Sequence, residues 1–554
     1  MNFSSLHKHK KLEFLILFAF VLTVFFSFKV SAIASSERFR RMAISRTTYH
    51  FSPDILRGTI RDCNGRMLAY SQKTISLYMY PESLDQANEI GSMLEDLNII
   101  KMDSFNALIE TSKGFTWIKR DISPQIVDTI NRLNFRGIGT YYDHLRRYAR
   151  QKEMAKVVGI LNLEGQGISG IEYSCERYLR GESWCTDLAR NHRGILYPLN
   201  SELAKICFSG AEIYLTLNID IQETADAILN EVVTNYSAKG GVIIVMDPHQ
   251  GDILAMASVG SSYSNQAISW SYEPGSTFKI VAAIAALSEK SVGLEEIVES
   301  GQCKIQIADM LINDAEIHPP YNFRDAVIHS SNVGFVNIAL KTGNFKIRNY
   351  CVLFGFGEKT GINLPAEVSG FIPKLEQWTD VTTASAAFGQ GISITPLQLC
   401  AAYGAIANNG YLIKPRIVDR VQNGNGQVYY NPVDTIRRIT TQSVADTFTS
   451  LLVEVVNQGT GTNASVHGLN IAGKTGTAEK SSPQGGYYED KFVSSFIGFF
   501  PAEKPRYLIC VIIDEPLGSY YGGIVAAPAF RKMVNEILKI ECYNRHLDLS
   551  IEIN

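Results

Sequence analysis

Four stretches of the sequence predict a fold that mixes helices and strands. Ile280–Leu287 is apolar and rich in alanine, as is typical of a buried helix. Ile219–Tyr236 has the spacing of an amphipathic helix, and a further helix is predicted at Pro124–Leu133. Leu469–Ala478 is typical of a strand, and its glycines leave room for another backbone to approach. The chain of 554 residues, 45% of them hydrophobic, is therefore expected to combine both element types around a large core.

The strongest chemical signal is Ser276–Lys279 (S-T-F-K), an S-x-x-K sequence at the start of the apolar helix. Glu273–Gly275 predicts a turn before it, so Ser276 is expected at the helix N-terminus, where unpaired N–H groups favour developing negative charge. Lys279 follows nearly one turn later on the same face. It can act as the base for a serine nucleophile only if burial or another cation lowers its pKa. A lone S-x-x-K, such as Ser5–Lys8, is more often a helix cap beside a solvated lysine, so other motifs must decide.

A second motif, Ser330–Asn332 (S-S-N), lies between two segments with helical character. These segments are Phe323–Ile328 and Val333–Leu340, so the motif is expected in the connection between two helices. A hydroxyl at this point can pass a proton to a leaving amine, and the Asn332 carboxamide can hold a substrate amide. An ordinary helix cap is the alternative interpretation, because Ser and Asn are common caps.

K-T-G sequences begin at Lys341, Lys359 and Lys474. Lys341 ends an apolar segment, so the glycine that follows is expected as a helix C-cap. Lys359 lies in a glycine-rich turn region. Lys474 instead lies within the predicted strand, to which a peptide substrate could add by main-chain hydrogen bonds. Lys474 is therefore the favoured copy, and its ammonium could be the cation that lowers the pKa of Lys279.

In this order the motifs match the S-x-x-K, S-D-N-like and K-T-G set of penicillin-binding proteins and β-lactamases. The chain resembles the class B branch of the penicillin-binding transpeptidase family from near residue 55 to near residue 540. The tracts that carry the resemblance in the catalytic part are Tyr272–Lys279, Gly241–Ser258, Phe388–Gly391 and Thr395–Gln398. Those that resemble the non-catalytic domain before it, here called the pedestal, are Arg57–Asp62, Asn64–Gly65 and Gly167–Gly181. The sequence departs from the family pattern at two places. Ala149 replaces an expected proline after Arg146–Tyr148, and the stretch between Ser258 and Tyr272 is shorter than usual. These departures leave the local geometry of the pedestal and of the pocket rim open.

The resemblance implies an α+β fold. Its catalytic domain would be of the penicillin-binding transpeptidase or serine β-lactamase-like type, an antiparallel sheet flanked by helices, on a mixed, β-containing pedestal. Neighbouring strands are expected at Lys474, Phe492–Phe500 and Tyr507–Ile513, and Pro528 is expected to open the last helix. The implied domains are residues 1–11 as a cytoplasmic tail, 12–34 as a transmembrane anchor, 35–216 as the pedestal, 217–540 as the catalytic domain and 541–554 as a C-terminal tail.

The resemblance also implies a peptidoglycan D,D-transpeptidase that forms a serine acyl-enzyme with stem peptides and is acylated by β-lactams. Ser276 would be the nucleophile and Lys279 the general base. Ser330 with Lys279 would protonate the departing D-alanine, and the backbone N–H groups of Ser276 and Thr477 would form the oxyanion hole. Other residues expected at the site are Asn332, Lys474, Thr475 and Gly476; no cofactor and no metal are expected.

The apolar stretch Leu12–Ile33 is the candidate membrane span, and it is long enough to cross one bilayer. A cleaved signal peptide is the alternative, because Ala32–Ala34 resembles a cleavage site. Basic residues flank both ends of the span, so charge leaves its orientation open. The inferred substrate implies a single-pass protein of the cytoplasmic (inner) membrane, with the N-terminus in the cytoplasm and the catalytic domain outside.

Composition weakens several other classes of function. A charged fraction of 19% gives no sign of disorder, and a net charge of −3 gives no reason to expect nucleic acid as a partner. The nine cysteines are scattered, without C-x-x-C or H-E-x-x-H, which argues against a structural zinc site. Among the cysteines, Cys175 and Cys185 are the only two that suggest a disulfide pair worth testing.

Two other classes remain as alternatives. A β-lactamase or D,D-carboxypeptidase would use water as the acceptor, and a β-lactam sensor or division scaffold would need no activity. Within class B, Phe496–Pro501, Asp514–Pro516 and Tyr520–Pro528 resemble the division branch (the FtsI type) more than the elongation branch. That branch implies septal wall synthesis, with a polytopic glycan polymerase and other division proteins as partners.

Overall fold

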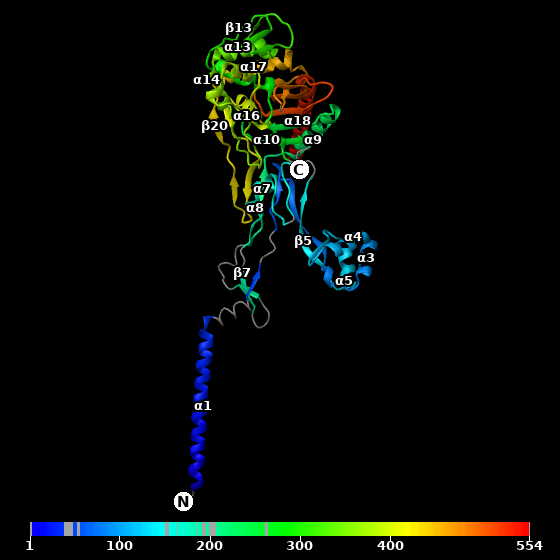
Figure 1. The fold of residues 1–554 in the computed structure, drawn as a ribbon, viewed down its shortest axis with the longest axis vertical. Coiled ribbons are helices and arrows are strands. Elements are labelled where there is room, and N and C mark those ends of the chain that lie inside the picture. The colour runs from blue at the N-terminus through cyan, green and yellow to red at the C-terminus, as the bar shows by residue number, and fades with distance from the viewer. Residues whose placement is uncertain are drawn as a thin grey trace. The chain divides into compact units, whose positions relative to one another are not determined.

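The computed structural model describes residues 3–37, 48–51, 56–133, 135–149, 154–162, 164–183, 186–190, 196–198, 207–260, 264–482 and 484–552 (Figure 1). The chain divides into two compact units. One comprises Met1–Leu56 with Gly181–Ser209, and the other comprises Arg57–Arg180 with Gly210–Asn554. Cys185, one half of the cysteine pair suggested by the sequence, lies outside the described residues.

The first unit begins with one long helix, α1 (Phe3–Ser35). Its segment Phe14–Ile33 has a mean hydropathy of 2.3 and buries none of its length within the protein, and it is long and apolar enough to cross a membrane. The predicted apolar helix is thus confirmed, although α1 begins well before residue 12. The rest of this unit is a three-stranded antiparallel sheet and a strand pair: β1 (Thr48–Phe51), β7 (Thr186–Arg190) and β8 (Leu196–Pro198), then β6 (Glu182–Ser183) and β9 (Cys207–Phe208).

The second unit contains the predicted antiparallel sheet, which has five strands in the order β12-β11-β23-β22-β21. The strands are β11 (Gly240–Met246), β12 (Ile253–Val259), β21 (Ala472–Ser481), β22 (Tyr487–Phe500) and β23 (Tyr507–Asp514). The sheet contains strands from both the beginning and the end of the long segment 240–514. β11 pairs with β23 along its whole length, although the two strands lie far apart in the sequence. The strand β21, which carries the K-T-G motif, forms one edge of the sheet.

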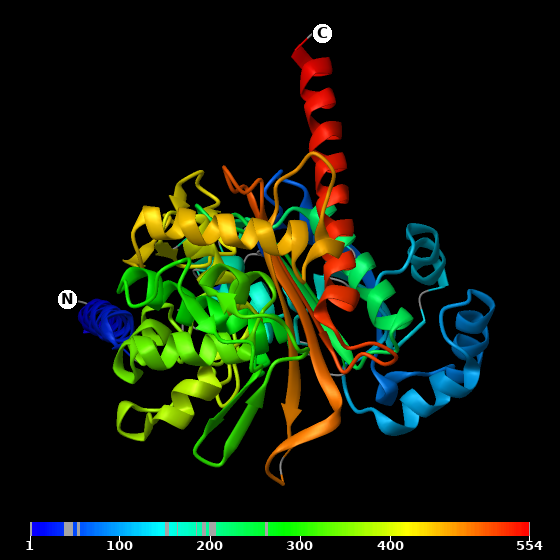
Figure 2. The same cartoon turned by 90° about the horizontal axis from the view of Figure 1, so that it is seen from above.

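Helices cover both faces of this sheet (Figure 2). Alternate residues of a strand point to opposite faces. Thus Ile243 packs in a core with α9 (Ile219–Asn235) and α18 (Gly522–Glu552), whereas its neighbour Ile244 packs in the larger core on the other face. The helices on that second side are α11 (Lys279–Ser288), α12 (Phe323–Ile328), α13 (Asn332–Thr342), α14 (Asn344–Leu353), α15 (Asp380–Ala387), α16 (Pro396–Ala407) and α17 (Gln442–Gln458).

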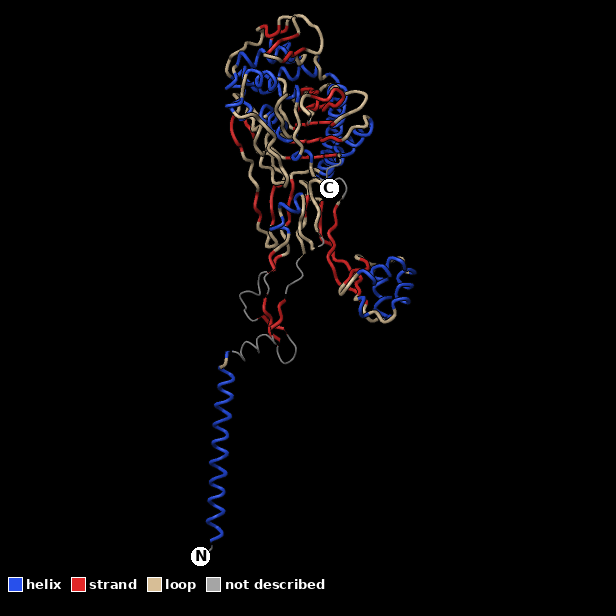
Figure 3. Tube along the Cα trace, viewed as in Figure 1, coloured by secondary structure: helices blue, strands red, loops and turns tan. Residues whose placement is uncertain are grey.

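A seven-stranded sheet combines strands from the N-terminal and C-terminal parts of this unit (Figure 3). Its main order is β19-β18-β10-β2-β3-β4, and β5 also pairs with β3. The strands are β2 (Ile60–Arg61), β3 (Met67–Met79), β4 (Thr116–Lys119), β5 (Ile138–Tyr148), β10 (Glu212–Leu215), β18 (Val418–Gln422) and β19 (Val428–Tyr430). Because β10 pairs with β18, the pedestal strands and the catalytic half share backbone hydrogen bonds.

Three helices form a small separate core against β3 and β5: α3 (Ala87–Asp96), α4 (Met102–Thr111) and α5 (Pro124–Leu133). The bounds of α5 are those predicted from the sequence. Its core side chains, Val127 and Ile130, lie on one face with the three-residue spacing of a helix.

A buried carboxylate, Glu172, connects separate tracts of the pedestal through ion pairs. It lies in α7 (Gly170–Ser174) and forms ion pairs with Arg57 and Arg146, both at 2.7 Å. A buried charge needs such partners, because an unpaired one would cost several kcal/mol. Arg146 therefore has a structural role even though the tract that follows it departs from the family pattern.

Of two predicted helix starts, one is confirmed and one is wrong. Ser276 lies at the N-terminus of the apolar helical stretch Gly275–Ser288, as predicted, and the first turn of this stretch is a 3₁₀ turn, η3 (Gly275–Phe278), before α11 begins at Lys279. Pro528 lies inside α18, which begins six residues earlier at Gly522. That earlier start is stabilised because the Gly522 N–H donates a hydrogen bond to Thr477 Oγ1 at 3.1 Å.

Candidate active site

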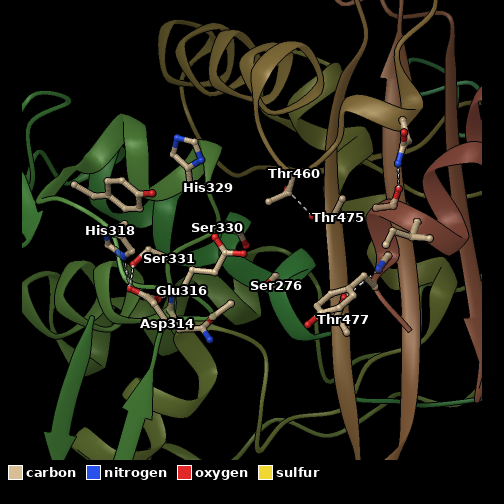
Figure 4. Close-up of a pocket in the computed structure, with 18 residues that line it drawn as sticks. Ser276, Asp314, Glu316, His318, His329, Ser330, Ser331, Thr460, Thr475 and Thr477 are labelled. Atoms are coloured by element: carbon tan, nitrogen blue, oxygen red, sulfur yellow. Dashed lines mark hydrogen bonds and ion pairs between the residues drawn. The ribbon is translucent and has the colours of Figure 1, made fainter. Parts of the chain in front are cut away.

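The three motifs meet in one cavity of about 520 Å³ in the second unit (Figure 4). Its lining includes Ser276, Ser330, Asn332, Thr475 and Thr477. Ser276 comes from η3, Ser330 from the α12–α13 connection, Asn332 from the first turn of α13, and the last two from β21. The sequence predicted that these distant residues converge, and the structure brings them together.

Close packing of η3 against β21 places Ser276 at the cavity wall. Gly275 has a φ of +56°, and a Cβ there would lie 2.9 Å from the carbonyl oxygen of Thr477. Only glycine combines this backbone conformation with such a close approach. On the buried side, the hydroxyl of Tyr403 in α16 donates to the carbonyl of Thr277 at 2.9 Å. Ser276 itself is half-buried, and its Oγ makes no hydrogen bond within the part of the chain that the structure describes.

Lys279 lies at the base of the cavity and is only 1% exposed. Its Nζ donates to the Ser330 carbonyl at 2.6 Å, to Ser330 Oγ at 3.1 Å and to Asn332 Oδ1 at 2.8 Å. Burial, and then the charge of Lys474, hold the pKa of Lys279 well below its usual value, although Asp314 opposes the shift. The neutral amine needed for a general base is therefore favoured at this position.

Ser330 links the two lysines. Its Oγ accepts from Lys474 Nζ at 2.8 Å as well as from Lys279 Nζ at 3.1 Å, and its φ of +60° turns the chain sharply between α12 and α13. Burial lowers the pKa of Lys474 to about 7. Near neutral pH, Lys474 can thus carry a charge or release it, and one hydroxyl connects it to Lys279. Such a chain suits proton transfer.

The S-S-N loop is held by Asp314, a residue that the sequence analysis did not identify. Asp314 follows β15 (Met310–Asn313) and accepts hydrogen bonds from Ser331 Oγ at 2.8 Å, from the Val333 N–H at 3.1 Å and from the Asn332 N–H. A carboxylate that receives the first N–H groups of α13 is stabilised by the positive end of the helix dipole. No motif marks this residue, because its partners lie 17 to 19 positions away in the sequence.

The edge strand β21 offers its free side to a substrate. A Cβ at Gly476 would lie 2.4 Å from Ser495 Oγ, so the strands and η3 can pack this closely only with glycine there. Thr475 Oγ1 shares a hydrogen bond with Thr460 Oγ1 at 2.7 Å. The backbone of an edge strand retains unpaired groups to which an extended peptide can add.

The two other K-T-G sequences serve local structure, as predicted. Lys341 ends α13 with an ion pair to Glu296, and Gly343 caps that helix with a φ of +101°. Thr360 donates its backbone N–H to Glu367 at 2.7 Å within a turn. Neither sequence lines the cavity described above.

Comparison with known proteins agrees with this architecture. A family described as the penicillin binding protein transpeptidase domain matches residues 241–535, more than half of the chain. A second, described as the penicillin-binding protein dimerisation domain, matches residues 54–214. The chain therefore belongs to the penicillin-binding protein transpeptidase family, in the class B branch, with the dimerisation domain ahead of the transpeptidase domain.

Individual relatives span most of the chain. A probable peptidoglycan D,D-transpeptidase PenA of Neisseria gonorrhoeae is 31% identical, over 87% of this chain and 84% of its own. Peptidoglycan D,D-transpeptidase FtsI of Buchnera aphidicola is 29% identical, over 87% and 86%. The crystal structure of penicillin binding protein 3 from Mycobacterium tuberculosis with aztreonam matches with a TM-score of 0.68 and 27% identity, over 88% of this chain and 96% of that one. The predicted α+β transpeptidase fold is thereby confirmed.

Proposed function

We propose that this chain is a serine-type peptidoglycan D,D-transpeptidase whose site consists of Ser276, Lys279, Ser330, Asn332, Lys474, Thr475, Gly476 and Thr477. The transpeptidase activity follows from the family and from relatives that bear this name. The observation that carries the assignment of roles is the buried Lys279, whose pKa is lowered and whose amine contacts both Ser330 and Asn332 in the cavity of Ser276.

The first half of the reaction is acylation. Neutral Lys279 takes the proton of Ser276 Oγ while Oγ bonds to the carbonyl carbon of the penultimate D-alanine of a stem peptide. The negative charge that develops on the carbonyl oxygen is held by the backbone N–H groups of Ser276 and Thr477, as in an oxyanion hole. The C–N bond then breaks, and the proton returns through Ser330 to the departing amine of D-alanine.

Binding of the peptide precedes this step. The donor peptide adds to the free edge of β21, and its terminal carboxylate meets protonated Lys474 with the hydroxyls of Thr475 and Thr477. Asn332 holds a substrate amide with its carboxamide. β-Lactams use the same contacts, and ring opening leaves them bonded to Ser276.

The second half transfers the acyl group. The amine of a neighbouring stem peptide attacks the ester and loses its proton to Lys279, which returns it to Ser276. If water attacks instead, the product is a shortened stem, so a D,D-carboxypeptidase side activity uses the same residues. The dimerisation domain supports the transpeptidase assignment, because neither a β-lactamase nor a lone D,D-carboxypeptidase needs such a domain for its reaction.

The cellular setting is proposed on the same basis. The anchor (12–34) would fix the protein in the cytoplasmic membrane, with the tail (1–11) inside and the pedestal (35–216), catalytic domain (217–540) and C-terminal tail (541–554) outside. The sequence likeness to the FtsI type supports septal wall synthesis, with a polytopic glycan polymerase and other division proteins as partners. The alternative is an elongation-type class B transpeptidase, which would synthesise the wall during cell elongation and not at the septum.

A product assay tests the proposed reaction. The full chain in detergent is given glycan strands with pentapeptide stems, and the muropeptides are separated and weighed by mass spectrometry. We expect cross-linked dimers together with free D-alanine, and neither in Ser276→Ala. Release of D-alanine without any dimer, under conditions in which acceptor amines are in excess, would instead assign a carboxypeptidase.

A further inference from the structure

Beside the S-S-N loop, three side chains with metal-binding atoms converge from separate parts of the chain. They are Glu299, at the end of β13 (Ile297–Glu299), Cys303, and His318 before β16 (Tyr321–Asn322). One ligand atom from each lies within 4.8 Å of the others. Glu299 is 2% exposed and Cys303 is 7% exposed. A buried carboxylate, a thiol and an imidazole thus face one small volume.

The imidazole is oriented as a metal ligand requires. Its Nδ1 lies 3.6 Å from Oε2 of Glu299, close to the roughly 3.3 Å that separates two N or O ligands of one tetrahedral metal ion. Its Nε2 lies 2.9 Å from Oδ2 of Asp314 (Figure 4). Metal-bound histidines generally donate their second ring N–H to a carboxylate in this way.

Backbone hydrogen bonds hold the other two ligands in place. The N–H groups of Gly301 and Cys303 donate to the Glu299 carboxylate at 2.6 and 2.9 Å. The N–H of His318 donates to Cys303 Sγ at 3.3 Å, while Sγ also lies 3.6 Å from the His318 carbonyl oxygen. Cys303 has a φ of +57°, a conformation uncommon for a residue other than glycine. The sulfur is therefore directed toward His318 by the loop itself.

We propose that Glu299 Oε2, Cys303 Sγ and His318 Nδ1 bind a zinc ion, with a water in the fourth position. Mixed nitrogen, oxygen and sulfur ligands suit Zn²⁺, whereas Mg²⁺ and Ca²⁺ prefer oxygen. On binding, the thiol and Nδ1 each release a proton to solvent, and the Nδ1–H bond to the Pro319 carbonyl, at 2.7 Å, is lost. The carboxylate and the thiolate together balance the two charges of the ion, so the buried site is neutral.

The ion would act on the active site through one chain of contacts. Zinc fixes the His318 ring, the ring orients Asp314, and Asp314 receives Ser331 Oγ and the first N–H groups of α13. That loop carries Ser330 and Asn332, which contact Lys279. His318 is therefore a positioning residue. This consequence rests on the proposed function, but the binding of zinc does not.

Metal content tests the site directly. The full chain in detergent is incubated with ZnSO₄, dialysed against metal-free buffer and measured by mass spectrometry for metals. We expect about one zinc per chain in the parent and in Ser276→Ala, and background values in Cys303→Ser and His318→Gln. Cys63→Ser and His467→Gln, at exposed positions, are matched controls that should keep the metal. Background zinc in the parent, or full zinc in Cys303→Ser, would overturn the proposal.

Cobalt provides a second readout that does not depend on whether the variants fold. Co²⁺ bound to the parent should give the intense near-ultraviolet absorption of a thiolate-to-metal charge transfer, and Zn²⁺ should displace it. A spectrum of bound Co²⁺ without that band would show that Cys303 is not a ligand and would contradict the site. Failure of cross-linking with normal zinc content would count against the proposed function alone.

Discussion

At the scale of single residues, the site depends on two buried lysines that share one hydroxyl. Lys279 and Lys474 both contact Ser330 Oγ, and burial lowers the pKa of each. Two cations so close together in a poorly solvated site disfavour each other's charge, so one of them gives up its proton. This arrangement favours a neutral amine and a nearby cation in the cavity of Ser276.

Replacing Lys279 by arginine should nearly abolish acylation. A guanidinium remains protonated at any usable pH, so it cannot take the proton of Ser276. We expect a loss of at least roughly a hundredfold in the rate of penicillin acylation, as is typical for removal of a general base. Lys290→Arg, at a surface position after α11, is the matched control. An Lys279→Arg protein that acylates within a few-fold of the parent would exclude the general-base role.

The pH dependence of acylation should have two limbs. The rate rises as Lys279 loses its proton, which happens below the usual range because its pKa is lowered. It falls as the pH passes about 7, because Lys474 then loses the charge that binds the substrate carboxylate. In Lys474→Arg the positive charge persists, so the falling limb should move to higher pH. A falling limb unchanged in that variant would assign it to another group.

The proposed catalytic residues could be identified in the sequence because each belongs to a short motif with a local context. Their supporting residues could not. Asp314 accepts hydrogen bonds from the S-S-N loop, and His318 contacts Asp314. Glu299 and Cys303 lie close to His318, although each comes from a different part of the chain. C-x-x-C and H-E-x-x-H detect only metal sites whose ligands lie close together in the sequence. Their absence therefore does not bear on the cluster of Glu299, Cys303 and His318, which comes from separate segments.

At the scale of elements, the hairpin of β14 (Lys304–Ile307) and β15 places Asp314, the residue after β15, at the start of α13. Asp314→Ala would leave the Ser331 hydroxyl and two backbone N–H groups without their acceptor. We expect a cost of about 2 kcal/mol to the loop, and roughly a thirtyfold drop in acylation rate if the loop must be ordered to react. Asp309→Ala, at an exposed position of the same hairpin, should change the rate little. Equal acylation rates for Asp314→Ala and Asp309→Ala would show that the S-S-N loop is ordered without the hydrogen bonds to Asp314.

Some regular elements could be predicted from the sequence. The helix at Pro124–Leu133 has the predicted bounds. The strands expected from the family resemblance at Phe492–Phe500 and Tyr507–Ile513 are present as β22 and β23, although β22 begins earlier, at Tyr487. The start of α18 was misplaced because the sequence suggested proline in the first turn, whereas contact with Thr477 fixes the start at Gly522. The 3₁₀ turn at Ser276 likewise depends on packing against β21, which lies some two hundred residues further along the chain.

At the scale of the whole molecule, the proposed septal role makes a cellular prediction. An enzyme of the division branch is needed only where the septum forms. Depletion of the protein from its native cell should therefore block septation, and microscopy should show filaments or chains of cells. Complementation with Ser276→Ala should fail, whereas Ser385→Ala, a half-buried serine away from the cavity lining, should restore division. Rounded, swollen cells that still divide would assign the protein to elongation.

The claim that Ser276 is the acylated nucleophile is tested most directly by mapping the covalent adduct. The full chain is incubated with fluorescent penicillin and digested, and the labelled peptide is sequenced by mass spectrometry. The label should lie on Ser276, at the turn before α11, and should disappear in Ser276→Ala while Ser385→Ala keeps it. Label on any other residue, or undiminished label in Ser276→Ala, would contradict the mechanism.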